Sequence, residues 1–337
     1  MALRLVRLAI NGYGRIGRCV LRALYESGAH KTCKIVAINE PADPATIAYL
    51  TRYDSTHGHF PGTVAQDGNT LIVNGDRIAL TAHKSLEALD WQQHDIDIVL
   101  ECSGVFSSRK KAQAHLKVGA KKVLFSQPAD QDIDAAVVCG INDEILKTEH
   151  TIASAASCTT NAIVPVIKVL DDAFGVVNGV ITTIHSAMND QPVLDGYHHT
   201  DLRKTRAALQ SLIPIDTQLA RGIERILPHL KNCFAAQALR VPTQNVSAMD
   251  LSVLLQKPVD VAAVNRALRA ASEGALQNIL GYTEEPLASC DFNHDARSGI
   301  VDASQTRVSG QLVKVLVWFD NEWAYANRML DIARRWR

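Results

Sequence analysis

The first half of the chain alternates short apolar runs with stretches of helical periodicity. The apolar runs that predict strands are residues 5–10, 34–38, 96–101 and 122–126. Stretches with helical spacing lie between them, as in residues 18–24 and 108–118. Alternation of this kind is typical of a doubly wound α/β domain with a parallel sheet, in which ligands bind at the carboxyl ends of the strands.

The pattern changes after Cys158, where the apolar runs become longer. Strands are expected at residues 176–186, 235–241, 248–256 and 308–319, with a helix at 261–276. This pattern favours an α+β domain in which helices cover an antiparallel sheet. The last stretch, residues 321–336, has the pattern of a helix that could pack back on the first domain.

Glycines cluster directly after the first predicted strand. Gly12, Gly14 and Gly17 form a G-x-G-x-x-G pattern with a strand before it and a helix after it. Such glycines allow a tight turn and a close approach of the backbone to a pyrophosphate, which the helix N-terminus attracts. Glu40 follows the second strand, where a carboxylate can bond the ribose hydroxyls of an adenosine and repel the 2′-phosphate of NADP. This order of elements predicts an NAD site in a Rossmann fold.

The length of the chain, 337 residues, exceeds that of one ordinary hydrophobic core, so two domains are expected. We predict a Rossmann dinucleotide-binding domain at 1–157, completed by a C-terminal helix at 319–337, and a catalytic domain at 158–318. Within the second domain, residues 188–217 form a long and weakly periodic segment. A segment of this kind is usually functional or buried between subunits.

Charge and cysteine content exclude several classes of function. Lys plus Arg equals Asp plus Glu at 35 each, so no net field favours nucleic acid or an anionic membrane. Seven scattered cysteines without a CxxC pair or a metal-ligand cluster predict a reducing cytoplasm and no metal. No uncharged run approaches the roughly 20 residues of a membrane span, and the first residues read as a strand rather than a signal peptide.

Cys158 lies at a predicted junction between a loop and a helix, within the sequence Ser-Cys-Thr-Thr-Asn. The helix dipole and the free N–H groups of the first turn are expected to lower the pKa of this thiol towards neutral and to hold an oxyanion. Ser157 or Thr159 would cap the helix, and Pro165 is expected only one turn in, where proline is tolerated. On its own, the motif also fits an ordinary buried cysteine.

Several longer motifs in order give the chain a resemblance to the glyceraldehyde-3-phosphate dehydrogenase superfamily over essentially its whole length. These motifs are residues 10–18 (INGYGRIGR), 53–58 (YDSTHG), 157–161 (SCTTN), 183–185 (TIH), 240–243 (RVPT) and 320–323 (DNEW). Within the superfamily, residues 185–188, 215–217 and 291–295 are most similar to the members that oxidise D-erythrose 4-phosphate.

The resemblance implies catalytic roles for two residues. Cys158 would be the nucleophile and His185 the base that activates it, so that a thiolate attacks an aldehyde and hydride transfer leaves a thioester. For the cofactor NAD, Asn321 would bind the nicotinamide carboxamide. Further contacts are implied for Arg15 and Ile16 on the pyrophosphate turn and for Lys84.

The anion ligands of the family map onto six positions of this chain. They are Ser157, Thr159, Lys204, Thr217, Gln218 and Arg240. Glycolytic members usually carry Thr where this chain has Met188, Arg where it has Lys204, and Gly where it has Gln218. The first two changes remove a hydroxyl donor and a bidentate fork, so a site for inorganic phosphate would be weakened.

These departures favour hydrolysis of the thioester by water. The expected activity is NAD-dependent, non-phosphorylating oxidation of a phosphorylated aldose, linked by resemblance to pyridoxal phosphate biosynthesis, in a cytoplasmic homotetramer. The alternative is phosphorylating oxidation of glyceraldehyde 3-phosphate. A non-catalytic protein that binds a partner such as RNA is disfavoured by the neutral charge and by the joint presence of Cys158 and His185.

Overall fold

The computed structural model describes residues 4–198 and 201–336. Contacts divide the chain into two compact units. One comprises the residues up to Ser157 together with the chain from Tyr325 onward, and the other is Cys158–Ala324. Among the described residues, no helix combines the length and the apolar character that a membrane crossing would require.

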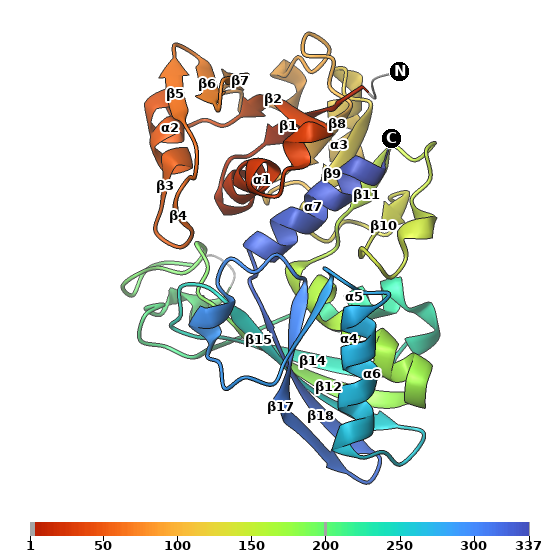
Figure 1. Cartoon of the computed structure of the whole chain (residues 1–337). Coiled ribbons are helices and arrows are strands. Elements are labelled where there is room, and N and C mark those ends of the chain that lie inside the picture. Colours follow the sequence, from red (N-terminus) through yellow and green to blue (C-terminus); the bar gives the residue numbers. More distant parts are fainter. Residues whose placement is uncertain (1–3, 199–200, 337) are drawn as a thin grey trace. The chain divides into compact units, whose positions relative to one another are not determined.

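The first unit is built on a largely parallel sheet, which confirms the α/β class (Figure 1). Its strand order is β10-β11-β9-β8-β1-β2-β7-β6-β5. The parallel strands are β1 (Val6–Asn11), β2 (Cys33–Asn39), β7 (Asp76–Thr81), β8 (Ile98–Glu101), β9 (Lys122–Phe125), β10 (Ala135–Ala136) and β11 (Ile152–Ser154). An antiparallel edge that the sequence did not predict follows, formed by β6 (Thr70–Val73) and β5 (Val64–Asp67).

Helices of the first unit begin where the sequence supplies capping groups. They are α1 (Arg15–Glu26), α2 (Pro44–Arg52), α3 (Arg109–Lys117) and α7 (Trp323–Arg335), whose first two residues belong to the second unit. The Asp43 carboxylate accepts a hydrogen bond from the N–H of Thr46 at the start of α2, and Ser108 caps α3. A two-stranded hairpin, β3 (Tyr53–Asp54) and β4 (Gly58–His59), follows α2.

A buried polar network joins the carboxyl ends of β1 and β8. The Glu101 carboxylate accepts hydrogen bonds from the Asn11 amide at 2.7 Å and from the Ser103 N–H at 2.9 Å, and it lies 2.9 Å from His115 Nε2. The Trp91 indole donates to Nδ1 of His115 at 3.0 Å, so the His115 proton is on Nε2 and points at Glu101. Because every member is satisfied, the network fixes the loop after β8 against the turn after β1.

The second unit holds a seven-stranded sheet in the order β13-β14-β12-β15-β18-β17-β16. The strands are β12 (Val176–His185), β13 (Ile213–Ile215), β14 (Phe234–Arg240), β15 (Ser247–Leu255), β16 (Leu280–Thr283), β17 (Gly299–Ser309) and β18 (Leu312–Phe319). Helices α4 (Cys158–Phe174), α5 (Leu219–Ile226) and α6 (Val261–Glu273) cover one face of it, with α5 and α6 packed on α4 (Figure 1).

Three predictions for the second unit need correction. The sheet is mixed rather than antiparallel, because β12 pairs in parallel with β14 and β16 with β17. The single strand expected at 308–319 is two strands, since the chain reverses at Gly310 with φ 63° and pairs with itself. Pro165 lies in the interior of α4 rather than in its first turn, and it cannot donate a hydrogen bond to the Asn161 carbonyl.

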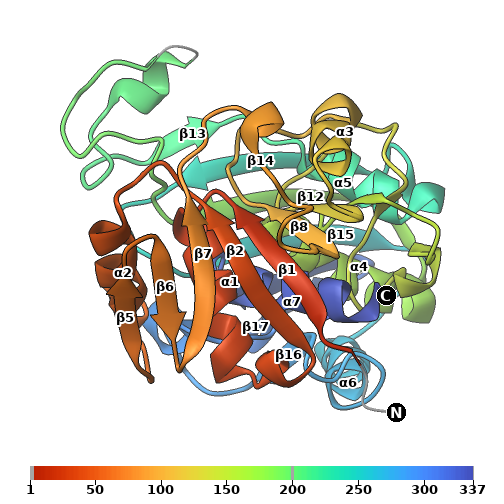
Figure 2. The same ribbon diagram turned by 90° about the horizontal axis from the view of Figure 1, so that it is seen from above.

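The segment 188–217 contains little regular structure, in keeping with its weak periodicity. It carries a single 3-10 turn at Leu202–Thr205 and the short strand β13, and its residues 199 and 200 lie outside the described part of the chain. In Figure 2 much of this segment projects beyond the end of β13.

Candidate active site

Strand register brings distant parts of the second unit to one edge of its sheet. In the parallel pair β12 and β14, His185 lies beside Arg240, and these are the last residues of the two strands. β15 runs in the opposite direction and begins at this edge with Ser247, which pairs with Phe319 at the end of β18. Asn321 follows two residues later, so these side chains share one sheet edge.

Cys158 is the first residue of α4, as the sequence predicts. Its Sγ lies 4.0 Å from Nε2 of His185, and the cysteine is half-buried. The chain enters α4 through Ala156, whose φ of 56° is in the left-handed region that costs a non-glycine residue energy. The Ala156 carbonyl accepts a hydrogen bond from the Tyr325 hydroxyl at 2.8 Å, and the N–H of Ala156 donates to Ser154 Oγ at 3.0 Å. No sequence pattern marks this strained turn.

The buried ring of His185 is held in one tautomer. Its Nδ1 lies 2.8 Å from the carbonyl oxygen of Ser186, which can only accept, so Nδ1 carries the proton and the lone pair of Nε2 faces Cys158. Burial lowers the pKa of His185 below its usual value, the hydrogen bond to Ser186 opposes this shift, and the charge of Arg240 adds to it. His185 is therefore neutral at neutral pH and free to accept a proton.

The thiol of Cys158 does not have the near-neutral pKa that its helix position predicts. Burial raises the pKa to about 11, while hydrogen bonding by the backbone N–H groups of Thr159 and Cys158 and the charge of Arg240 act in the expected downward direction. Desolvation of the thiolate outweighs the helix N-terminus, so the resting pair is a neutral thiol beside a neutral imidazole. The lone pair of His185 Nε2, 4.0 Å from Sγ, lies on the side of the ring that faces this thiol.

Two of the predicted anion ligands are joined by one carboxylate. Arg240 is buried, and its Nη1 donates to Asp190 Oδ1 at 2.5 Å and to Gln191 Oε1 at 3.0 Å. Lys204, from the 3-10 turn, donates to the other oxygen of Asp190 at 3.0 Å. Burial raises the pKa of Asp190, but the two cations outweigh it and hold the pKa below its usual range. The sequence did not single out Asp190.

The other predicted anion ligands lie at the starts of two helices. The Thr217 hydroxyl accepts a hydrogen bond from the N–H of Leu219 at 3.2 Å, and Gln218 is exposed directly before α5. Ser157 and Thr159 flank Cys158 at the start of α4. Met188, the position with an apolar side chain in place of a hydroxyl, is 46% exposed.

Asn321 is anchored by two hydroxyl groups of the second unit. Its Oδ1 lies 2.9 Å from Ser186 Oγ and 2.9 Å from Ser247 Oγ. The preceding residue, Asp320, is fully buried and accepts hydrogen bonds from the N–H groups of Glu322 and Trp323 at 3.0 and 2.8 Å. Asp320 thus fixes the turn that carries Asn321, which explains why an acidic residue precedes it.

In the first unit, the glycine turn has the geometry that a dinucleotide site needs. Gly12 has φ 89°, and a Cβ there would lie 2.4 Å from the Cα of Ser103. A Cβ at Gly17 would lie 2.4 Å from the carbonyl oxygen of Gly12, whereas a Cβ at Gly14 would meet open space. No side chain caps α1 at Gly14. The N-terminus of a helix that begins in this way attracts a phosphate.

The remaining cofactor residues surround this turn to differing degrees. Glu40 follows β2, and its Oε2 accepts a hydrogen bond from the N–H of Tyr13 at 2.8 Å, which places the carboxylate at the turn. Arg15 binds both oxygens of Asp54, at 2.5 and 3.1 Å. Ile16 is half-buried in the first turn of α1, and Lys84 is exposed in the loop after β7. The start of α1, the glycine turn and the carboxylate of Glu40 together form a site that fits NAD.

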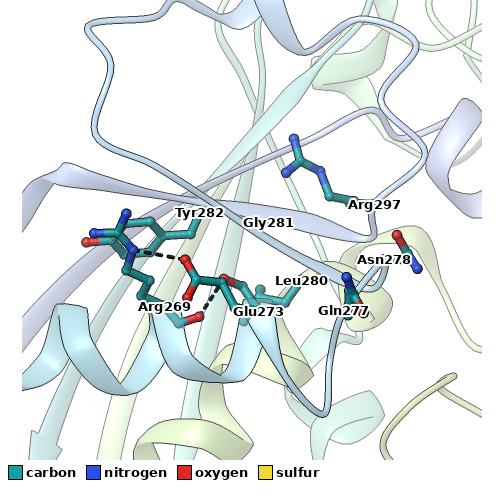
Figure 3. A pocket seen from close by; sticks show the side chains of 9 residues that line it. Arg269, Glu273, Gln277, Asn278, Leu280, Gly281, Tyr282 and Arg297 are labelled. Atoms are coloured by element: carbon teal, nitrogen blue, oxygen red, sulfur yellow. Dashed lines mark hydrogen bonds and ion pairs between the residues drawn. The ribbon is translucent and has the colours of Figure 1, made fainter.

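A separate pocket lies between α6 and β16 (Figure 3). Figure 3 shows Arg269 paired with Glu273, at 3.0 Å, and Arg269 also lies 5.4 Å from the ring centroid of Tyr282. None of the residues predicted to bind substrate or cofactor lines this pocket. Arg269 pairs with Glu273 inside the pocket, and Arg297 pairs with Asp295 next to it, so the pocket adds nothing to the site around Cys158.

Comparison with known families supplies the context for both units. Residues 6–109 match the family described as the NAD binding domain of glyceraldehyde 3-phosphate dehydrogenase. Residues 157–321 match the C-terminal domain of the same enzyme. The first match covers the glycine turn and Glu40, and the second covers Cys158, His185 and Asn321. The chain belongs to the glyceraldehyde 3-phosphate dehydrogenase family and is an NAD-dependent oxidoreductase.

Proposed function

We propose that this enzyme oxidises D-erythrose 4-phosphate to 4-phospho-D-erythronate, with water as the acyl acceptor, as a D-erythrose-4-phosphate dehydrogenase in pyridoxal phosphate biosynthesis. The observation that carries the proposal is the carboxylate of Asp190, shared between Arg240 and Lys204. A protein anion already neutralises one of the two cations in this part of the site. One positive charge is left for the phosphate of the substrate, and little attraction remains for a second, inorganic phosphate.

The chemistry begins with proton transfer between two neutral groups. Nε2 of His185 accepts the proton of Cys158, the thiolate attacks the aldehyde carbon, and His185 returns the proton to the resulting oxyanion to give a hemithioacetal. The N–H groups at the start of α4, where Cys158 lies, would stabilise the developing oxyanion. NAD, when bound, would supply the acceptor for the hydride of the hemithioacetal carbon. His185 takes the hydroxyl proton as that hydride leaves. A thioester on Cys158 results.

Hydrolysis completes the cycle. After His185 has released its proton to solvent, a water molecule attacks the thioester carbon and gives a proton to Nε2 of His185. The carbon–sulfur bond then breaks to release the free acid, and His185 returns the proton to the sulfur to restore the thiol. Arg240 and Thr217 would hold the substrate phosphate throughout, and Asn321 would orient the nicotinamide ring. Met188 offers no hydroxyl to a phosphate ion that could compete with the water.

The test compares initial rates of NADH formation with erythrose 4-phosphate and with glyceraldehyde 3-phosphate, each with and without inorganic phosphate. We expect faster turnover of the four-carbon aldehyde and no requirement for phosphate. Preference for the three-carbon aldehyde together with strict phosphate dependence would instead support the alternative, phosphorylating glyceraldehyde-3-phosphate dehydrogenase. In the variant Met188→Thr, which restores the hydroxyl, we expect phosphate to begin to accelerate turnover.

A variant of Asp190 tests the role of the shared carboxylate. Asp190→Asn keeps the shape but removes the charge, so the site should bind inorganic phosphate about tenfold more tightly, measured as inhibition or activation of the oxidation. The matched control is Asp195→Asn, which removes an exposed carboxylate that pairs with Arg206 in the same segment at 3.0 Å. Equal phosphate affinity in the wild type and Asp190→Asn would remove the main support for hydrolysis.

We further propose that the enzyme is a cytoplasmic homotetramer, with the segment 188–217 in subunit contacts. Large apolar side chains are exposed along this segment, and a second copy of the chain is the expected cover. They are Met188, Val193, Leu194, Tyr197, Leu202, Leu209 and Leu212.

All seven cysteines lie in the described residues and are free thiols, which supports a reducing compartment. Sedimentation of the wild type and of the variant Leu194→Glu tests the assembly. We expect a tetrameric wild type and a smaller species for the variant, and a monomeric wild type would contradict the proposal.

A further inference from the structure

Three side chains from separate parts of the second unit meet at the sheet edge. Ser186 follows the last residue of β12, Ser247 is the first residue of β15, and Asn321 follows β18. Both serine side chains are buried, with 0% and 1% exposure, whereas Asn321 is half-buried. The two hydroxyl oxygens lie 2.9 Å from the same atom, Oδ1 of Asn321.

Both hydroxyl groups donate to Oδ1 of Asn321. The Ser247 oxygen in turn accepts a hydrogen bond from the backbone N–H of Ser186 at 3.1 Å, so this hydroxyl acts as donor and acceptor at once. Two hydroxyl donors at one position require a carbonyl oxygen there, so the Asn321 amide has Oδ1 toward the serines and Nδ2 on the opposite side.

We propose that Ser186 and Ser247 are positioning residues that make Asn321 present an N–H donor, and not its carbonyl oxygen, to the nicotinamide carboxamide. The carboxamide is then recognised at its oxygen, and its amino group is not needed for binding. This inference rests on the proposed role of Asn321 as the nicotinamide ligand.

Ser186 also connects this amide to the catalytic base. Its carbonyl oxygen accepts the hydrogen bond from Nδ1 of His185 at 2.8 Å, and its hydroxyl holds Asn321. One residue therefore sets both the tautomer of the base and the orientation of the cofactor ligand. The two functions use different atoms, so Ser186→Ala removes the contact to Asn321 and leaves the contact to His185.

Binding of cofactor analogues to the wild-type enzyme tests the inference without any substitution. The 3-acetylpyridine analogue of NAD keeps the carbonyl oxygen and replaces the amino group with methyl. The thionicotinamide analogue keeps the amino group and replaces the oxygen with sulfur, a weaker acceptor. Measured by calorimetry without aldehyde, the acetylpyridine analogue should bind within about threefold of NAD and the thio analogue about tenfold more weakly.

Variants of the two serines then test whether they set this preference. In the double variant Ser186→Ala/Ser247→Ala, Asn321 can rotate to present either end, so the difference between the two analogues should shrink to about threefold or less. In each single variant, the difference in affinity between the two analogues should lie between that of the double variant and that of the wild type. Ser298→Ala is the matched control, since Ser298 is 3% exposed and its hydroxyl has no hydrogen-bond partner.

Two results would overturn the inference. One is tight binding of the thio analogue with weak binding of the acetylpyridine analogue to the wild type, because Asn321 would then be an acceptor. The other is an unchanged preference in the folded double variant, checked by its melting temperature. Failure of the proposed function looks different: Asn321→Ala would leave the affinities of NAD and both analogues unchanged.

Discussion

The glycine turn of the first unit and the sheet edge of the second unit are built in different ways. The turn is made of backbone: a left-handed Gly12, a contact between Gly17 and the Gly12 carbonyl, and the uncapped start of α1. The sheet edge is made of side chains that strand register brings together, among them His185, Arg240 and Ser247. We infer that the turn tolerates no added atom at Gly12 or Gly17, whereas the edge depends on particular functional groups.

The largest effect is expected from removal of the base at the sheet edge. His185→Asn should lower kcat by about 10³, since it removes the imidazole nitrogen that faces a thiol whose pKa burial raises. The affinity for NAD should change little, because the glycine turn is untouched. The measurement is the rate of NADH formation in the first turnover, followed by rapid mixing. A rate within threefold of that of the wild type would rule out His185 as the base.

A matched pair of glycine substitutions tests the backbone-built site. Gly12→Ala adds a methyl group 2.4 Å from the Cα of Ser103 at a positive φ, and we expect a loss of about 2–4 kcal/mol in the free energy of unfolding. Gly14→Ala adds the same group in open space and should cost less than about 1 kcal/mol, although it can hinder the cofactor. Urea unfolding measures both, and equal losses would refute the distinction.

Glu40 is the acidic residue that accepts the hydrogen bond of the Tyr13 N–H in the glycine turn, and its substitution sharpens the comparison. Glu40→Gln removes the charge that repels the 2′-phosphate of NADP but keeps an acceptor for the N–H of Tyr13. We expect the preference for NAD over NADP to fall about tenfold, measured as the ratio of kcat/KM values. An unchanged ratio would mean that another residue selects the cofactor.

The smallest effect concerns pH and involves only the sheet edge. His185 acts as a base in its neutral form, and burial lowers its pKa from the usual 6.5. Activity is therefore lost only when the pH falls through this lowered value, and kcat/KM at pH 6.5 should stay within about twofold of its value at pH 7.5. An acid limb with its midpoint above pH 7 would contradict a lowered pKa.

Sequence patterns predicted the first unit well because its site is local. The strand, the glycines, the helix and Glu40 follow one another within about 35 residues, and each has its own signal. Cys158 at the start of α4 was also predictable, because a loop-to-helix junction is a local feature. The family resemblance selected His185, Arg240 and Asn321, and the structure places them at one sheet edge with Arg240 beside His185.

Long-range features escaped prediction. Asp190, Ser186 and Ser247 act through neighbours far away in the sequence, so no spacing marks them. The prediction of a lowered pKa for Cys158 was wrong for the same reason. Burial by distant residues raises this pKa by more than the local helix dipole lowers it. The break of the predicted strand 308–319 was missed although Gly310 marks the turn, since flanking apolar runs hid it.

The central claim is that water, and not inorganic phosphate, receives the acyl group from Cys158. The most direct measurement is ³¹P NMR of the products when the enzyme oxidises erythrose 4-phosphate with NAD in buffer that contains inorganic phosphate. We expect a single phosphorylated product, the free acid, formed in equal amount to NADH, with the inorganic phosphate signal unchanged. An acyl phosphate signal that grows with NADH while inorganic phosphate is consumed would contradict the claim.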